Sequence, residues 1–272
     1  EPSIGGNMAK LDKTFPTLDC SICILGPLMN IVAHHPNIEL YTYSEVISIN
    51  GRVGDFSVKI LKKPRYVRED LCRGCLICIA KCPGKAVDEF NMGLSHRKAI
   101  YVPFPQSVPR IPVIDTASCL YFQKGICRAC EKLCPANAID FNQKEEVVEI
   151  KVGAIVVATG FEEYNVSQVY EYGYSRYPNI VTGLQLERLA SSYGPTEGRL
   201  IAPGLDREPR RIAIINCVGS RDERYLPYCC RVGCMASLKH AWYIKHLIPE
   251  AEVFIFADAV RASGRGFEEV YR

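Results

Sequence analysis

The cysteines constrain this chain more than any other feature of its sequence. There are 14 of them in 272 residues, and many stand only two or three positions apart. Cysteines so close together are poor partners for disulfides between distant loops but good metal ligands, and no secretory signal precedes them. The sequence therefore predicts metal sites rather than a disulfide scaffold. It also predicts a reducing compartment, which we expect to be the cytoplasm of an anaerobe.

Residues 64–142 hold eight of these cysteines in two runs, each ending in Cys-Pro. The first run is Cys72, Cys75, Cys78 and Cys82, and the second is Cys119, Cys127, Cys130 and Cys134. In paired ferredoxin-type runs, three thiolates bind one cluster and the fourth binds the other. The pattern predicts one 4Fe–4S cluster on Cys72, Cys75, Cys78 and Cys134, and a second on Cys119, Cys127, Cys130 and Cys82. Zinc is the alternative, but zinc sites seldom use four thiolates at this spacing before proline.

Strand-like runs flank the cysteine-rich segment. Those before it are Ile38–Tyr43, Val46–Ile49 and Phe56–Leu61, and those after it are Val147–Ile150 and Gly153–Gly160. We therefore expect residues 1–63 and 143–165 to be two halves of one domain, with residues 64–142 inserted between them. Prolines in residues 102–112 predict an extended excursion between the two cysteine runs.

Two glycine-containing turns stand at the ends of this split domain. Glycine lets the backbone approach a phosphate or a flavin ring without an intervening side chain, although a single such segment is more often an ordinary turn. In this order they predict an FAD domain, with cofactor-binding residues Gly5, Gly6, Asn7, Val46, Ala158, Thr159 and Gly160. The G-x-G-x-x-G turn and the ribose-binding acid of such domains are absent, and we expect both before the first residue given.

The remaining residues predict a linker and a second α/β domain. Residues 166–208 form the linker, with a helix at Leu184–Tyr193 that Thr182 caps and Gly194 ends. Residues 209–272 begin the second domain, which the chain end cuts short. Its predicted strand, helix and strand are Arg211–Asn216, Met235–Leu247 and Ala251–Phe256.

A third group of cysteines lies in this second domain. Its members are Cys217, Cys229, Cys230 and Cys234. Thiolates near a helix N-terminus are stabilised by its dipole, so the group predicts a third cluster, with Cys20 or Cys23 as a replacement ligand. The alternatives are buried structural cysteines, and a redox disulfide between Cys20 and Cys23. Lys239, on the same helix as Cys234, is by pattern alone a solvated charge.

Charge and hydropathy exclude other classes of protein. The formal charge is +3, with 33 basic residues spread among 30 acidic ones, which argues against a nucleic-acid partner. No apolar run approaches the roughly 18 residues of a membrane helix, so we expect no direct membrane insertion. After Asn216, the run Cys217-Val218-Gly219-Ser220-Arg221 lacks the glycines of a nicotinamide site.

Four segments resemble the A-type subunit of heterodisulfide reductase. They are Gly6–Cys23, Arg97–Gln106, Cys217–Glu223 and Arg261–Glu269. The resemblance implies a thioredoxin-reductase-like flavoprotein of two dinucleotide-binding domains with an inserted 2×(4Fe–4S) ferredoxin domain. It also implies that Lys239 lies near the flavin N5 and tunes the flavin. One departure concerns the third cysteine group, because the family reads Cys where this chain has Gly233, and this chain has Cys230 instead.

The resemblance implies an oxidoreductase subunit that relays electrons between FAD and 4Fe–4S clusters, and in methanogens splits electron pairs at the flavin. Its implied partners are subunits of the B and C types, with the heterodisulfide reduced on the B type in methanogens, and a hydrogenase or formate dehydrogenase module. One alternative is a non-catalytic ferredoxin-like electron-transfer protein. Others are a subunit of a quinone-coupled sulfate-reduction or sulfur-oxidation complex, and the electron-input subunit of a glutamate-synthase-like enzyme.

Overall fold

The computed structural model describes all 272 residues and divides into two compact units. Unit 1 consists of Glu1–Gly6 and Leu25–Gly160, and unit 2 consists of Asn7–Ile24 and Phe161–Arg272. Each unit is therefore built from two separate stretches of chain. Helix α1 (Ser21–His34) contributes its first turn to unit 2 and the rest of its length to unit 1.

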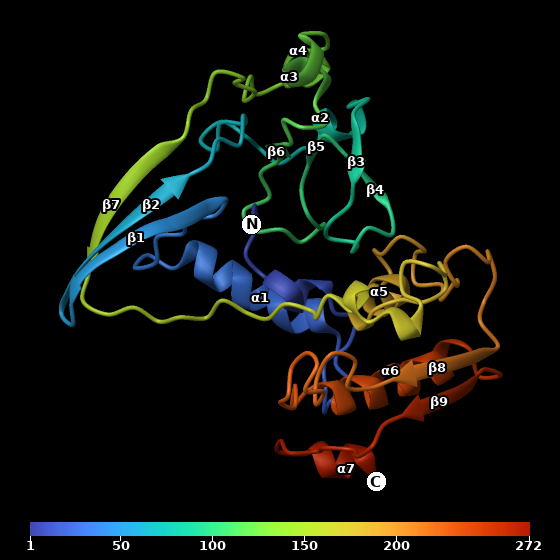
Figure 1. Cartoon of the computed structure of the whole chain (residues 1–272). Helices are drawn as coiled ribbons and strands as arrows, with labels where there is room; N and C mark the ends of the chain where they lie inside the picture. Colours follow the sequence, from blue (N-terminus) through green and yellow to red (C-terminus); the bar gives the residue numbers. More distant parts are fainter. The chain divides into compact units, whose positions relative to one another are not determined.

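The sheet of unit 1 is antiparallel, in the order β1 (Ser44–Arg52), β2 (Asp55–Lys62) and β7 (Glu146–Val152) (Figure 1). Val58 and Ile60 of β2 are buried, as the alternating pattern of this strand predicts. Lys62 is paired with Glu146 in the β2–β7 ladder, and their side chains form an ion pair of 3.5 Å. The chain thus leaves the sheet at Lys62 and returns beside the same residue.

The segment between these two paired strands folds into a small module. It contains two short hairpins, β3–β4 and β5–β6, and three short helices. The elements are α2 (Ile77–Ala80), β3 (Lys85–Val87), β4 (His96–Lys98), β5 (Ile100–Tyr101), β6 (Val113–Ile114), α3 (Leu120–Lys124) and α4 (Ala129–Lys132). A buried cluster of apolar residues forms its core, from Val67 through Ile100 and Ile114 to Phe141. Residues 102–112 contain neither helix nor strand, as their prolines predict.

Unit 2 contains a β-α-β arrangement, as the sequence predicts. Strands β8 (Arg211–Ile215) and β9 (Glu252–Phe256) are parallel, and α6 (Gly233–Leu247) connects them. Helix α6 contacts β9, α5 (Gly183–Ala190) and α7 (Phe267–Tyr271). Short 3-10 helices lie at Gly6–Lys10, Val166–Gln168 and Tyr170–Tyr172. No helix in the 272 residues combines the length and hydropathy needed to cross a bilayer.

Two predicted strands are wrong. Gly153–Gly160 has no regular secondary structure, and Val156 is 90% exposed, because no strand of this chain lies beside it. Ile38–Tyr43 is also irregular. The return strand of the split domain is therefore limited to β7, which ends at Val152.

The caps of α5 show how its sequence fixes one end of a helix. Thr182 accepts a hydrogen bond from the Gln185 amide, and the Gln185 side chain accepts one from the Thr182 amide, which completes a capping box. The helix ends at Ala190, earlier than the prediction of Tyr193. Gly194 follows in a tight return where a Cβ atom would lie 1.7 Å from the Arg188 carbonyl oxygen. Glycine is therefore required there by close approach of the backbone.

Candidate functional site

The two cysteine runs of the small module meet through their helices. Cys78 lies in α2 and Cys130 in α4, and the two helices contact each other. Burial raises the pKa of Cys78 to about 12, and the neighbouring thiols of Cys130, Cys72 and Cys134 add to the rise. Cys134, the last cysteine of the second run, therefore lies near Cys78 of the first run.

Cys82, the last cysteine of the first run, lies near cysteines of the second run. Burial raises the pKa of Cys130 to about 11, and its thiol neighbours are Cys119, Cys82 and Cys127. These four cysteines also line one small cavity of about 20 Å³, together with the apolar side chains of Ile100 and Ile114. The cavity offers four sulfur donors and an apolar wall, a donor set that suits an iron–sulfur cluster.

Tight backbone turns bring these sulfurs together. Gly74 (φ 62°) and Leu76 (φ 61°) both have left-handed conformations between the first cysteines of the first run, and so does Cys127 (φ 88°) in the second. The amide of Ala138 donates a hydrogen bond of 3.3 Å to the Cys134 sulfur. No three His, Cys, Asp or Glu side chains in the chain gather closely enough to hold a single metal ion. A cubane keeps its thiolates farther apart than a single ion does, because iron and sulfide lie between them.

The third cysteine group is less closely assembled. Arg221 contacts the Cys217 sulfur at 4.0 Å, and both this thiol and the charge of Cys229 raise the pKa of the guanidinium. Cys234 is buried and donates to the Ala259 carbonyl at 3.6 Å, whereas Cys230 is exposed. Cys217 and Cys229 thus share a cationic neighbour, whereas Cys230 and Cys234 have other surroundings.

Cys20 and Cys23, considered as replacement ligands for that group, are bonded to each other in a disulfide. The structure therefore agrees with the alternative of a disulfide at this position. A sulfur in a disulfide offers no thiolate to iron, so neither cysteine is a ligand in this state.

The predicted flavin-binding residues lie in irregular segments, at the start of the 3-10 helix Gly6–Lys10 and on one strand. Gly5 (φ 119°), Gly6 (φ 51°) and Gly160 (φ 77°) adopt conformations that favour glycine, and no atom lies within 4 Å of a Cβ built on Gly6 or Gly160. A ligand could approach both glycines closely for that reason. The Asn7 side chain donates a hydrogen bond of 2.6 Å to the carbonyl of Phe161, which follows Gly160. The remaining members of the predicted set are exposed: Val46 on β1, and Ala158 and Thr159 in the irregular segment.

Lys239 is buried, so the interpretation of it as a solvated charge is wrong. Its side chain is 2% exposed and forms an ion pair of 2.5 Å with Glu187 of α5, which is 1% exposed. The same ammonium donates a hydrogen bond of 2.8 Å to the Lys13 carbonyl. It also lies 5.8 Å from the centre of the Phe15 ring, within cation–π distance.

Glu187 is the centre of this buried cluster. Its Oε1 also contacts the His240 Nε2 at 2.5 Å, and its Oε2 accepts a hydrogen bond of 2.8 Å from the Asp12 amide. Burial alone would raise the pKa of Glu187, but His240 and Lys239 outweigh burial and hold that pKa at about 2. The carboxylate therefore stays ionised although it is removed from water.

Sequence reasoning missed Glu187 and His240. One signal was present, because Glu187 and Arg188 follow Leu184 by three and four positions and so share its buried helix face. Nothing in the local pattern indicates that α5 and α6 pack together, and the Glu187–Lys239 pair depends on that contact.

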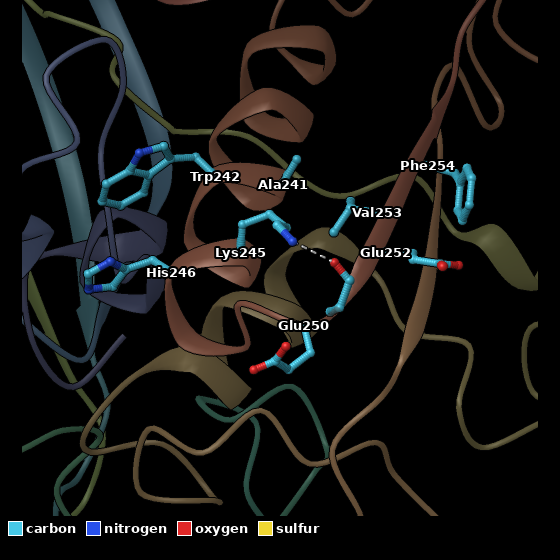
Figure 2. A pocket seen from close by; sticks show the side chains of 9 residues that line it. Ala241, Trp242, Lys245, His246, Glu250, Glu252, Val253 and Phe254 are labelled. Carbon is cyan, nitrogen blue, oxygen red and sulfur yellow. Dashed lines mark hydrogen bonds between the residues drawn. The ribbon is translucent and has the colours of Figure 1, made fainter.

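A concavity of about 820 Å³ lies elsewhere in unit 2 (Figure 2). It is lined by one face of α6, with Trp242, Lys245 and His246, and by residues 250–254. The rings of Trp242 and His246 stack with centres 5.4 Å apart, and the Lys245 ammonium donates to the Ala251 carbonyl at 3.0 Å. None of the residues selected from the sequence lines this concavity.

Similarity to known proteins extends over the whole chain. It is 48% identical over 272 residues to the A-type subunit of the H2:CoB–CoM heterodisulfide, ferredoxin reductase of Methanothermobacter thermautotrophicus. The chain is homologous to the A-type subunit of heterodisulfide reductase. It is also 48% identical over 273 residues to the iron-sulfur A-type subunit of the CoB–CoM heterodisulfide reductase of Methanocaldococcus jannaschii. A third relative, 45% identical over 273 residues, is the A-type subunit of the ferredoxin/F420H2-dependent CoB–CoM heterodisulfide reductase of Methanosarcina acetivorans.

The homologous region is one part of a larger protein in these relatives. The chain is covered completely in each of the three comparisons, but it spans only 40%, 41% and 34% of the lengths of the three proteins. No family model matches the chain. The similarity to heterodisulfide reductase agrees with the resemblance expected from the four sequence segments.

Proposed function

We propose that this chain is the electron-relaying part of an iron–sulfur flavoprotein subunit in a heterodisulfide reductase-like complex. One observation carries the proposal: the last cysteine of each run lies near the other run, Cys134 near Cys78 and Cys82 near Cys130. This is the arrangement that two adjacent 4Fe–4S clusters require. The name of the Methanocaldococcus relative as an iron-sulfur subunit supports the same assignment.

In this proposal, residues 64–142 are a ferredoxin module inserted between β2 and β7. The pairing of Lys62 with Glu146 supports insertion, because the module begins and ends at neighbouring positions of one sheet. The clusters supply one-electron transfer, and the protein holds them with four thiolates each. The apolar core around Ile100, Ile114 and Phe141 limits water around the sulfurs.

The proposed flavin site consists of Gly5, Gly6, Asn7, Val46, Ala158, Thr159 and Gly160, with Lys239 near the flavin ring. A bound FAD supplies the step between electron pairs and single electrons. An ammonium has three N–H donors, and Glu187 and the Lys13 carbonyl account for two at Lys239, which leaves one for a ligand. Glu187 and His240 would then position Lys239 rather than contact the ligand themselves.

Cys217, Cys229, Cys230 and Cys234 are the proposed ligands of a third cluster. Support comes from Arg221, whose guanidinium lies 4.0 Å from the Cys217 sulfur and also interacts with Cys229. The partners in this proposal are subunits of the B and C types, of which the B type carries the disulfide or sulfur chemistry, together with a hydrogenase or formate dehydrogenase module. Splitting of electron pairs at the flavin is part of the same proposal.

A non-catalytic electron-transfer protein is the second candidate. The exposed, irregular course of Gly153–Gly160 favours it, because the sequence predicts a strand of the flavin domain there. Flavin content of the full-length protein separates the two candidates. Stoichiometric FAD supports the flavoprotein subunit, and its absence supports the electron carrier.

The iron–sulfur assignment is tested on this chain by anaerobic reconstitution, followed by iron and sulfide assay and electron paramagnetic resonance. We expect at least eight irons per chain, and replacement of all eight cysteines of residues 72–134 by serine to remove eight. Loss of fewer than eight irons in that variant, or uptake of zinc in place of iron by the parent chain, would contradict the paired clusters.

A further inference from the structure

The disulfide between Cys20 and Cys23 contributes little to the stability of the fold. It joins residues three positions apart, with Cα atoms separated by 5.3 Å, at the start of α1. Stabilisation by a disulfide grows with the length of chain that it closes, and this loop is short. The turn is already fixed by hydrogen bonds: the Cys20 carbonyl accepts one from the Ile24 amide, and the Ser21 amide donates one to the Asp12 carbonyl.

The two sulfurs have different environments. Cys23 is exposed, in the first turn of α1, whereas Cys20 is half-buried and immediately precedes that turn. An external thiolate therefore reaches the Cys23 sulfur more readily. The leaving sulfur is then Cys20, next to the N-terminus of a 14-residue helix, where the helix dipole stabilises a thiolate. A stabilised leaving thiolate speeds thiol–disulfide exchange.

The disulfide is joined by backbone to the buried cluster of Glu187. Lys13 and Cys20 form an antiparallel bridge, and the Thr14 amide donates to the Asp19 carbonyl at 2.9 Å, so residues 13–20 close a small loop. The carbonyl of Lys13 is the one that accepts the Lys239 hydrogen bond. The disulfide is thus connected to the buried Glu187–Lys239 ion pair through the backbone bridge between Cys20 and Lys13.

We propose that Cys20 and Cys23 form a redox-active disulfide that exchanges electron pairs with small thiols and their disulfides. In the forward direction, a thiolate RS⁻ attacks the Cys23 sulfur, forms R–S–S–Cys23 and releases the Cys20 thiolate. A second thiolate RS⁻ attacks the sulfur of R, forms RSSR and releases the Cys23 thiolate. Two thiols are oxidised to one disulfide, the Cys20–Cys23 pair gains two electrons, and the two protons of the thiols pass to the protein thiolates or to solvent.

The chain provides a direct readout of this pair. Trypsin cleaves after Lys13 and next after Arg52, so the peptide Thr14–Arg52 contains Cys20 and Cys23 and no other cysteine. The folded chain is equilibrated anaerobically with mixtures of reduced and oxidised glutathione, quenched with an alkylating reagent and digested. Mass spectrometry then gives the fraction of this peptide that carries two labels, independently of the other 12 cysteines.

We expect the doubly labelled fraction to rise from below one tenth to above nine tenths as the ratio [GSH]²/[GSSG] increases about 100-fold, the course of a two-electron couple. A structural disulfide would stay closed at every ratio, because such bonds resist the glutathione pool. A pair that is labelled at every ratio would not be a disulfide under these conditions. Either result would overturn the proposal.

The single variants test which sulfur is attacked. Cys20→Ser leaves the exposed Cys23 thiol, and we expect it to accumulate a mixed disulfide with glutathione at least tenfold more than Cys23→Ser does. The double variant Cys20→Ser/Cys23→Ser is the matched control and should carry no adduct on this peptide. Equal adducts on the two single variants would refute the assignment of Cys23.

Iron content separates this proposal from a role in cluster binding. We expect both single variants to bind as much iron as the parent after reconstitution. A loss of four irons in either variant would make the cysteines cluster ligands and would overturn the redox-active disulfide. The labelling measurement does not require any cluster, so its outcome is independent of the proposed electron-relay function.

Discussion

Replacement of Glu187 by glutamine should destabilise unit 2 by about 3 kcal/mol at pH 7. Two estimates of the magnitude agree. The folded protein holds the pKa of Glu187 at about 2 instead of 4.5, and at about 1.4 kcal/mol per pH unit this corresponds to about 3 kcal/mol. Removing one partner of a buried ion pair costs roughly 3–5 kcal/mol, because the other charge stays buried without compensation. Lys239, which is 2% exposed, is that other charge.

The sign of the pH dependence follows from the lowered pKa. A carboxyl group whose pKa is lower in the folded state stabilises that state fully above its unfolded pKa. The contribution is lost as pH falls from about 4.5 towards about 2. The difference in free energy of unfolding between the parent and Glu187→Gln should therefore be largest at pH 7 and should shrink across this acidic range.

The assay can be restricted to the unit that carries the cluster. Trp242 is the single tryptophan of the chain and lies in α6, the helix that carries Lys239 and His240. Guanidinium unfolding followed by tryptophan fluorescence therefore reports on unit 2. Glu268→Gln is the matched control, since Glu268 pairs with Arg272 at an exposed position and should change the midpoint little.

A double variant tests the cause. Glu187→Gln/Lys239→Met removes both charges, and replacing a buried pair by apolar side chains is often close to neutral. We therefore expect it to recover most of the stability lost in Glu187→Gln. If the single variant costs less than about 1 kcal/mol at pH 7, or if the double variant is as unstable as the single one, an uncompensated buried Lys239 is not what destabilises the protein.

Three further predictions concern the cofactors. Cys134→Ser should weaken the cluster of Cys72, Cys75 and Cys78, and Cys82→Ser should weaken the cluster of Cys119, Cys127 and Cys130. Electron paramagnetic resonance of the reduced proteins distinguishes the two clusters. Damage confined to the cluster of the substituted cysteine's own run would contradict cross-ligation. FAD should stay bound to the full-length protein on desalting and be lost from this chain, since the missing contacts to ribose and pyrophosphate are each worth roughly 1–3 kcal/mol; tight, stoichiometric FAD in the 272-residue chain would refute this. In the full-length protein, Lys239→Ala should shift the flavin potential and Cys234→Ser should lower iron content by four; unchanged flavin potential and iron would leave these residues with packing roles.

The spacing of the cysteines is a local property that can be read from the sequence, and the cluster ligands that it indicates stay predictions. The runs ending at Cys82 and Cys134 indicate short turns and helices, and the structure has Cys134 near Cys78 and Cys82 near Cys130. The β-α-β order of residues 211–256 was also readable, since alternating strands and an amphipathic helix follow one another directly.

Contacts between segments far apart in the sequence could not be predicted from local patterns. Glu187 and Lys239 are 52 positions apart, and each looks like a surface charge until α5 packs on α6. The apolar run of Gly153–Gly160 has the composition of a buried strand, but a strand needs a neighbour to complete its hydrogen bonds, and this chain supplies none there. The composition of Gly153–Gly160 favours a strand, but the segment is irregular because no neighbouring strand pairs with it.

The way in which unit 2 is assembled has a consequence for how such a chain can change in length. Its two pieces, Asn7–Ile24 and Phe161–Arg272, are held together by bonds such as that from Lys239 to Lys13, across an intervening 136 residues. The entropy cost of closing so long a loop rises only with the logarithm of its length, by about 0.6 kcal/mol for each doubling. Halving or doubling the intervening chain would therefore alter the stability of unit 2 less than removing Glu187 would. A host of this kind can acquire, enlarge or discard an inserted module in evolution while its own fold stays nearly unaffected.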